Sequence, residues 1–273
     1  MLMASTEMFR PDIPSAARMY DYYLGGKDNY PADRETAEQL ISIMPPGVMR
    51  SGARQNRAFL GRAVRYLVGE RGIRQFLDIG TGLPTMDNVH EVAQSTAPES
   101  RVVYVDNDPV VLAHGRDMLH AVRHTVIISG DLRHPAEILA ERELREMLDL
   151  KQPVAVLLIA VLHFIGDADD PCEIIRHLMD VMPDGSYLAI SHTTADNHPE
   201  FAEAAEIYRD AGITARNRTH AEVEDLFTGL DLIEPGVVQL SHWHADQGTD
   251  DRGGGLGWCG VARKRTRLPQ PCP

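Results

Sequence analysis

Two acidic side chains and two glycines follow apolar segments in an order that is typical of nucleotide-like cofactor sites. Asp78 lies near the end of one short apolar run, and Gly80-Thr81-Gly82 comes directly after it. A second run ends in Asp106, whose carboxylate could accept hydrogen bonds from both hydroxyls of a ribose. Glycines let a ligand approach the backbone closely, and the helix start expected after them favours anionic groups. The pattern predicts a nucleoside-containing cofactor.

The residues after the glycines separate two cofactor classes. Nicotinamide dinucleotide sites favour a third glycine in this turn, where helix and strand pack closely, but here Thr85 holds that position. S-adenosylmethionine has no phosphate and needs an acid near its amino group and another at its ribose, which Asp78 and Asp106 supply. Asp131 could accept from an adenine amine while Leu132 packs on the ring. The sequence favours S-adenosylmethionine, with a nicotinamide cofactor as the weaker alternative.

The elements that must position these residues follow from alternating strand and helix patterns after Gly72. Such alternation is typical of a mostly parallel, doubly wound sheet. Asp108-Pro109 and Asp170-Pro171 are expected to begin helices, because Asp caps a helix and proline suits its first turn. Expected strands cover residues 75–79, 101–106, 124–129, 154–161 and 186–191, with 236–241 and 256–263 closing the sheet as an antiparallel pair.

Residues 1–70 are expected to form an N-terminal helical extension, 71–263 the cofactor-binding domain and 264–273 a flexible tail. An amphipathic helix is predicted over 48–68. Arginines are frequent in and after this helix. We interpret them as a solvated face, with an anion site as the alternative.

The bulk composition limits the partners and the compartment. The 273 residues carry a formal net charge of -13, which disfavours general nucleic-acid binding. No apolar run reaches the ~20 residues that span a bilayer, so we expect no membrane partner. Cys172, Cys259 and Cys272 form neither a metal pattern nor a disulfide framework, which favours a cytoplasmic location. His242 and His244 have only Asp246 as a further ligand at fixed spacing, and nothing supplies a second shell, so no metal site is expected.

Further motifs along the chain point to one family. They are Met19–Tyr30 with its Gly-Gly-Lys-Asp-Asn stretch, Ala32–Glu35, Asp78–Thr85, Asn88–His90, Val156–Phe164, Asp169–Pro171, Glu234–Val237 and Trp243. Over roughly residues 70–263 the chain resembles the class I S-adenosylmethionine-dependent methyltransferases. With all motifs together it is similar to a bacterial S-adenosyl methyltransferase family, long catalogued as a domain of unknown function.

This resemblance implies an α/β, Rossmann-like fold: a seven-stranded, mostly parallel sheet with helices on both faces and an N-terminal helical extension. It implies an S-adenosylmethionine-dependent methyltransferase that acts on an unidentified small-molecule acceptor, and it leaves the oligomeric state open. The cofactor is expected at the carboxyl edge of the first four strands. The predicted cofactor-binding residues are Gly26, Asp78, Gly80, Thr81, Gly82, Asp106, Asn107, Asp131, Leu132 and Ala160.

Two residues that we expect beside the methyl acceptor are candidates for catalysis. A methyltransferase mainly orients the acceptor and excludes water, and it needs a base only for some acceptors. His163 lies at the end of the fourth strand and could be that base or form part of the pocket wall. The alternative is that it caps the strand end through hydrogen bonds to the backbone. Tyr23 belongs to a tyrosine-rich segment, residues 20–30, that we interpret as a lid; a structural turn with Lys27 paired to Asp28 is the alternative. Because no base is unambiguous, a non-catalytic protein that binds S-adenosylmethionine or S-adenosylhomocysteine remains a second hypothesis.

Overall fold

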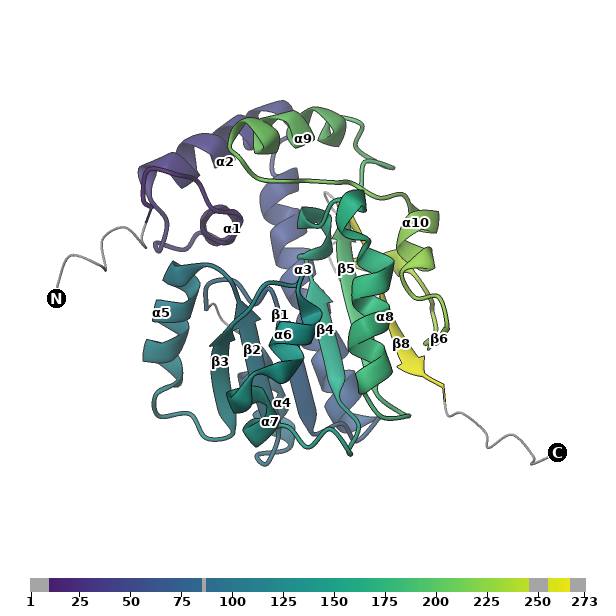
Figure 1. Ribbon diagram of the computed structural model, residues 1–273. Coiled ribbons are helices and arrows are strands. Elements are labelled where there is room, and N and C mark those ends of the chain that lie inside the picture. The colour runs from purple at the N-terminus through teal and green to yellow at the C-terminus, as the bar shows by residue number, and fades with distance from the viewer. Residues whose placement is uncertain (1–9, 85–86, 246–254, 266–273) are drawn as a thin grey trace, which may run out of the picture.

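The chain forms a single twisted sheet with helices on both faces and a helical layer over one edge (Figure 1). The computed structural model describes residues 10–84, 87–245 and 255–265. Its sheet order is β3-β2-β1-β4-β5-β8-β6, with β7 paired to β8. The parallel strands are β1 (Gln75–Ile79), β2 (Arg101–Asp106), β3 (Thr125–Ser129), β4 (Ala155–Ile159) and β5 (Tyr187–Thr193).

The antiparallel end of the sheet agrees with the sequence in part. β8 (Gly257–Lys264) pairs antiparallel with β5, and the short β7 (Val238–Gln239) pairs antiparallel with β8, as the predicted closing pair required. The edge strand is β6 (Leu230–Leu232), which the sequence analysis missed because three residues give too short a pattern. The predicted tail begins within β8 at Lys264, and residues 266–273 lie outside the described residues.

Two groups of helices cover the two faces of the sheet. The first group comprises α3 (Val48–Gly69), α4 (Val89–Thr96) and α5 (Pro109–Leu119), which share one apolar core with the sheet. The second comprises α6 (Pro135–Ala140), α7 (Arg142–Met147), α8 (Pro171–Val181) and α10 (His220–Asp225). Alternate residues of the buried strands enter the two cores, as the pleat of a strand requires: Phe76 joins the first and Leu77 the second.

The predicted helix starts are confirmed where capping residues mark them. Asp108 caps α5 by accepting from the Val110 backbone N–H at 2.8 Å. Asp170 caps α8 by accepting from the Glu173 backbone N–H at 3.0 Å. In both helices proline holds the first helical position, where its missing N–H leaves no hydrogen bond unmade. These caps place the loops after β2 and β4 at the same edge of the sheet.

A helical layer lies over that edge, at the top of Figure 1. It consists of α1 (Ala16–Leu24), α2 (Pro31–Ile43), the first turns of α3, and α9 (Phe201–Asp210). Met19, Leu40 and Phe201 are among its buried residues. Its helices come from both ends of the chain, whereas the sequence suggested an N-terminal extension alone. The division at residue 70 therefore stays a prediction, since α3 runs from this layer into the sheet core.

Polar contacts fasten the helical layer to the sheet. Asp33 is fully buried and accepts from the Ser15 backbone N–H and from Arg18 Nε, both at 2.8 Å. The Ser15 hydroxyl lies 2.5 Å from an oxygen of Asp108, the residue that caps α5. Removing one partner of a buried ion pair is strongly destabilising. These contacts therefore fix α1 directly above the loop that follows β2.

The arginines of α3 do not all lie on a solvated face. Arg50, Arg54 and Arg65 are exposed, as expected. Arg62 is buried, and donates to the Leu240 carbonyl at 2.6 Å and the Trp243 carbonyl at 2.8 Å. The solvated-face interpretation is thus wrong for Arg62, because its guanidinium satisfies backbone acceptors of a loop 180 residues away. None of the described helices combines the length and apolar character needed to cross a membrane.

Candidate functional site

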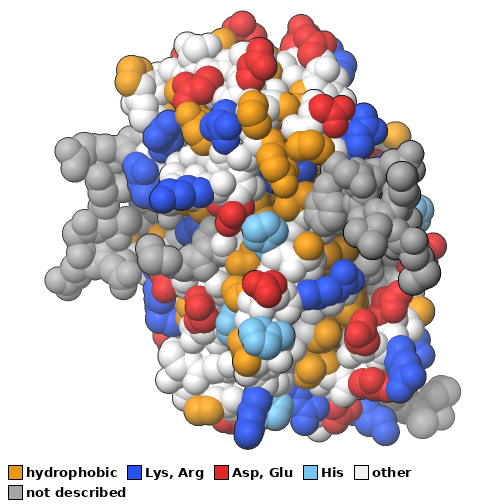
Figure 2. Space-filling model, turned by 90° about the vertical axis from the view of Figure 1, so that its left-hand side faces the viewer, with side chains coloured by type: hydrophobic (Ala, Val, Ile, Leu, Met, Phe, Trp, Pro, Cys, Tyr) orange, Lys and Arg blue, Asp and Glu red, His pale blue; other side chains and the backbone are white. Residues whose placement is uncertain are grey.

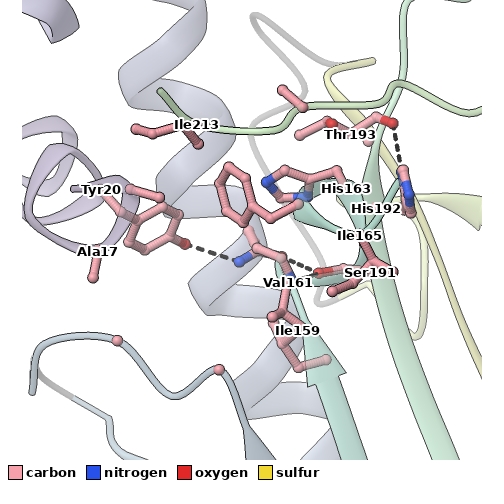
Figure 3. A pocket seen from close by; sticks show the side chains of 18 of the residues that line it. Ala17, Tyr20, Ile159, Val161, His163, Ile165, Ser191, His192, Thr193 and Ile213 are labelled. Carbon is pink, nitrogen blue, oxygen red and sulfur yellow. Dashed lines mark hydrogen bonds between the residues drawn. The ribbon is translucent and has the colours of Figure 1, made fainter. Parts of the chain in front are cut away.

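A cavity of about 540 Å³ lies between the carboxyl ends of the parallel strands and the helical layer (Figure 3). Open α/β sheets bind ligands at this edge, where connections leave opposite faces of the sheet. Nine of the ten predicted cofactor-binding residues line the cavity, and so do His163 and Tyr23. Gly26 does not.

The glycine turn after β1 has the conformation that the sequence predicted. Gly80 and Gly82 have φ of 76° and 67°, which favours glycine. At Gly80 an added Cβ would lie 2.4 Å from Val161, so no larger residue fits. At Gly82 an added Cβ would meet nothing within 4 Å, which leaves open space beside the turn. The Gly82 N–H donates to Asp106 at 2.9 Å and thereby ties the turn to the end of β2.

Asp78 is a buried acid beside this turn. Burial raises its pKa to about 7, although the positive charge of Arg57 and a hydrogen bond from Thr81 act against the rise. A cationic group bound next to Asp78 would stabilise the ionised form. Arg57 also lines the cavity and donates to the Asp87 carbonyl at 3.0 Å. The sequence analysis did not identify Arg57 as a site residue, because nothing in the sequence distinguishes it from the solvent-facing arginines of the same helix.

Asp106 is held rigidly at the end of β2. One carboxylate oxygen accepts from the Gly82 N–H and the other from the Asp108 N–H, each at 2.9 Å. Burial raises the pKa of Asp106 despite these hydrogen bonds. A carboxylate oxygen accepts more than one hydrogen bond, so both oxygens retain capacity for a diol. Asn107 follows in the same loop and also lines the cavity.

Asp131 and Leu132 lie where β3 ends. Leu132 is buried, and Asp131 is paired with Arg133, whose Nε lies 3.0 and 3.1 Å from the two carboxylate oxygens. The hydrogen bonds from Arg133 lower the pKa of Asp131 to about 2, so this carboxylate is ionised. Its role as an adenine acceptor stays a prediction, and Arg133 is an added cavity residue that the sequence did not single out.

A chain of polar contacts joins α1, α3 and β5 along the cavity (Figure 3). Asn56 of α3 donates to the Tyr20 hydroxyl at 2.8 Å and accepts from the Ser191 hydroxyl at 2.5 Å. Ser191 accepts in turn from the Ala160 N–H at 2.9 Å. Ala160 has φ of 54°, which ends β4 and turns the chain toward His163. Asn56 and Ser191 carried no sequence signal, since the elements that join them are distant in the chain.

His163 lies in η1 (Leu162–Phe164) with its side chain inside the cavity wall (Figure 3). It is 8% exposed, and its Nδ1 is buried without a hydrogen-bond partner among the described residues. Burial, together with His192 and Arg218 nearby, holds the pKa of His163 well below its usual range. The imidazole is therefore neutral. Nδ1 of this ring does not cap the strand end, because it makes no hydrogen bond to a described backbone group.

His192, in contrast to His163, has a polar partner at each of its ring nitrogens. Its Nε2 lies 2.9 Å from Nη1 of the buried Arg218, which can only donate, and its Nδ1 lies 2.7 Å from the Thr193 carbonyl. These partners assign the proton to Nδ1. Burial lowers the pKa of His192 to about 4. Arg218 also donates to the Leu162 and Ile165 carbonyls at 3.1 Å, so it fixes the segment that carries His163.

The tyrosine-rich segment contributes side chains but not its glycine pair. Tyr23 is 5% exposed, and its hydroxyl interacts with that of Tyr208. Gly26 lies where an added Cβ would be 1.9 Å from a carboxylate oxygen of Asp21. The prediction that Gly26 approaches the cofactor is therefore wrong: its lack of a side chain accommodates Asp21. The Asp28 N–H also donates to Asp21, at 3.0 Å, so this acid organises the turn.

Comparison with known proteins identifies the family. A model of the S-adenosyl methyltransferase family matches residues 4–265. A DUF574 family protein from Streptomyces avermitilis is 46% identical, with a TM-score of 0.89 over 93% of this chain and 99% of that one. A candidate methyltransferase from Thermobifida fusca is 38% identical, with a TM-score of 0.90 over 97% of this chain and 100% of that one.

More distant structures show the fold alone. The plantazolicin methyltransferase BamL, at 11% identity, has a TM-score of 0.54 over 92% of this chain and 96% of its own. No curated protein matches the sequence closely enough to count as a relative. The family match spans nearly the whole chain and agrees with the geometry of the turn and the acids. The chain belongs to the S-adenosyl methyltransferase family and is a methyltransferase with S-adenosylmethionine as its cofactor.

Proposed function

We propose that the protein methylates a small-molecule acceptor bound in the same cavity as the cofactor, beside His163. The observation that carries this proposal is the division of the cavity. Charged groups line its floor at the ends of β1 to β3, while aromatic and aliphatic side chains line its roof. His163 lies between the two parts. A cavity of about 540 Å³ falls within the range of small-molecule sites.

The residues of the floor fit S-adenosylmethionine. Asp78, a buried acid with a raised pKa, would hold the ammonium group, and Arg57 would hold the carboxylate of the methionine part. Asp106 would accept from the ribose hydroxyls, beside the open space at Gly82. Leu132 would pack on the adenine, as predicted from the sequence. Opposite charges paired in a buried site reinforce one another, because the effective dielectric constant is low.

The bound cofactor supplies an activated methyl group, and the side chains must then position the acceptor and exclude water. The roof formed by α1 and α9 covers the strand edge and thus restricts solvent. His163, neutral and with a free Nδ1, can accept a hydrogen bond from the acceptor nucleophile. Tyr23, also neutral because burial holds its pKa well above the usual range, can orient a second polar group.

The molecular surface supports a small acceptor over a nucleic acid. The net charge of -13 opposes phosphate, and the face shown in Figure 2 has acidic and basic side chains interspersed instead of a broad basic area. One of the exposed arginines of α3, Arg50, lies 3.6 Å from the acidic side chain of Glu38.

Titration calorimetry with S-adenosylmethionine and S-adenosylhomocysteine tests the cofactor site. We expect micromolar binding by the wild type and a loss of at least tenfold in Asp106→Ala, since the ribose loses its acceptor. Asp180→Ala, which removes an exposed carboxylate of α8 outside the cavity, is the matched control and should bind like the wild type. Equal binding by Asp106→Ala would refute the assignment of the ribose site.

A further inference from the structure

The charged residues that line the cavity are confined to its floor. Within the described chain they are Arg57, Asp78, Asp106, Asp108, Asp131 and Arg133. The roof and the wall beside η1 form what we term the acceptor compartment, lined by Tyr23, His163, Phe164, Phe201, Tyr208 and Ile213. None of these six side chains carries a charge, because the imidazole is neutral and both tyrosine pKa values are raised by burial.

Aromatic rings line this compartment from His163 to Tyr23. The ring centroids of His163 and Phe164 are 4.1 Å apart, and those of Phe164 and Tyr208 are 6.1 Å apart. Tyr208 interacts with Tyr23 through their hydroxyls, so Tyr23 has a polar neighbour within the compartment. At the other end, Nδ1 of His163 is buried and has no hydrogen-bond partner among the described residues. A buried acceptor left unsatisfied is unfavourable, and the hydroxyl of a ligand would satisfy it.

We propose that the acceptor is an uncharged, planar molecule whose nucleophile is a phenolic or enolic hydroxyl hydrogen-bonded to His163. This inference rests on the proposed function and adds the chemical class of the acceptor. A carboxylate or ammonium in the acceptor compartment would be buried without an opposite charge, at a cost of several kcal/mol. A planar body fits because rings line the wall and stack favourably on other rings.

The environment of His163 determines how acidic the hydroxyl of the acceptor must be. The buried Arg218 guanidinium and His192 lie behind this imidazole and oppose its protonation. It is therefore a weak base and cannot activate an aliphatic alcohol, whose pKa of about 16 is like that of water. A phenol, with a pKa of about 10, needs far less help. Its nucleophile is a neutral hydroxyl at physiological pH, so it enters the compartment without charge.

The transfer balances in charge and in atoms. The acceptor oxygen forms a bond to the methyl carbon as the carbon–sulfur bond breaks, and the electron pair of that bond stays on sulfur. The hydroxyl proton passes to His163 and then to solvent. Sulfur loses its positive charge as the imidazole gains one, so the net charge of the cavity does not change. The positive charge on the imidazole is transient, because the neighbouring Arg218 guanidinium opposes it.

The first experiment uses three probes with one planar body: naphthol, naphthoate and naphthylmethylammonium. Each is titrated into the protein saturated with S-adenosylhomocysteine. We expect naphthol to bind at least tenfold more tightly than either ion, and to yield its methyl ether, seen by mass spectrometry, when S-adenosylmethionine is supplied. Equal or tighter binding of an ion, or methylation of naphthylmethylammonium but not naphthol, would overturn the inference. A protein that fails to bind S-adenosylhomocysteine at all would instead refute the proposed function.

A variant of His163 separates its chemical role from a structural one. His163→Gln retains a hydrogen-bonding group of similar reach but cannot take up the proton. We expect kcat for naphthol to fall at least a hundredfold, as for loss of a general base, while the Kd values of naphthol and S-adenosylhomocysteine change less than threefold. An unchanged kcat would overturn the role of His163. A change in both Kd values with kcat preserved would indicate a structural role and would also overturn it.

Discussion

At the scale of single residues, Asp78 makes cofactor binding depend on pH. Its raised pKa of about 7 means that the free protein holds this carboxyl partly protonated near neutrality. An ammonium ion bound beside it favours the ionised form, so binding must release a proton below pH 7. We expect the affinity for S-adenosylhomocysteine to rise up to about tenfold per pH unit between pH 5 and 6.5, and to level off near pH 7.

Calorimetry in two buffers of different ionisation enthalpy measures the released proton directly. Asp78→Asn keeps the shape of the side chain but cannot ionise, so its affinity should be lower and flat over this pH range. Asp106 also has a raised pKa, and Asp106→Asn tests whether it contributes to the slope. If Asp78→Asn retained the full wild-type pH dependence, the proton would have to come from another group.

At the scale of elements, α3 joins the helical layer, the sheet core and the loop after β7. Arg62 makes the last of these connections, through two backbone carbonyls. We expect Arg62→Met, which fills the same space without donors, to lower the free energy of unfolding by about 2–4 kcal/mol, because buried acceptors lose their partners. Urea denaturation measures this change. Arg65→Met, on an exposed position of the same helix, should change it by less than about 0.5 kcal/mol.

The elements also show how far the sequence could predict the structure. β1 and β2 were predicted to the residue, because short apolar runs with acids near their ends leave strong local patterns. The three-residue β6 and the role of α9 in the helical layer were missed, since pairing to β8 and packing on α2 are non-local. Asp78, Gly80 and Asp106 were identifiable because each lies at or next to the carboxyl end of a strand. Asn56, Arg57 and Ser191 were not, because only the tertiary fold brings them to the cavity.

At the scale of the whole molecule, cofactor binding should stabilise the helical layer as well as the sheet edge. Ser15 contacts Asp108, two residues after Asp106, and Arg18 and Asp33 carry that contact into α1 and α2. We expect S-adenosylhomocysteine to slow hydrogen exchange in α1 by at least tenfold, because a ligand that binds only the closed protein disfavours local opening. Exchange in α7, on the opposite edge, should not change. Protection confined to the β1 turn would contradict this coupling.

At the same scale, His192 contributes a loss of stability in acid, because it excludes a proton in the native state. Its pKa is about 4 in the folded protein, against 6.5 for the unfolded chain. Between these values the unfolded chain binds the proton that the native protein excludes, so the free energy of unfolding decreases as pH falls, by up to about 3 kcal/mol in total. Asp78 acts in the opposite direction: the native protein retains its proton up to about pH 7, so its contribution decreases as pH rises from 3.8.

The variant His192→Gln isolates the first of these opposing contributions. A glutamine oxygen can still accept from Arg218, so the contacts that hold the His163 segment are retained. Between pH 6.5 and 4.5 the wild type should lose up to about 1.4 kcal/mol more per pH unit than the variant, as urea denaturation at several pH values would measure. Above pH 7 the difference between the two should be constant. If the free energy of unfolding had the same pH dependence in the wild type and the variant, His192 would have to take up its proton in the native state, and Arg218 would have to move away to permit it.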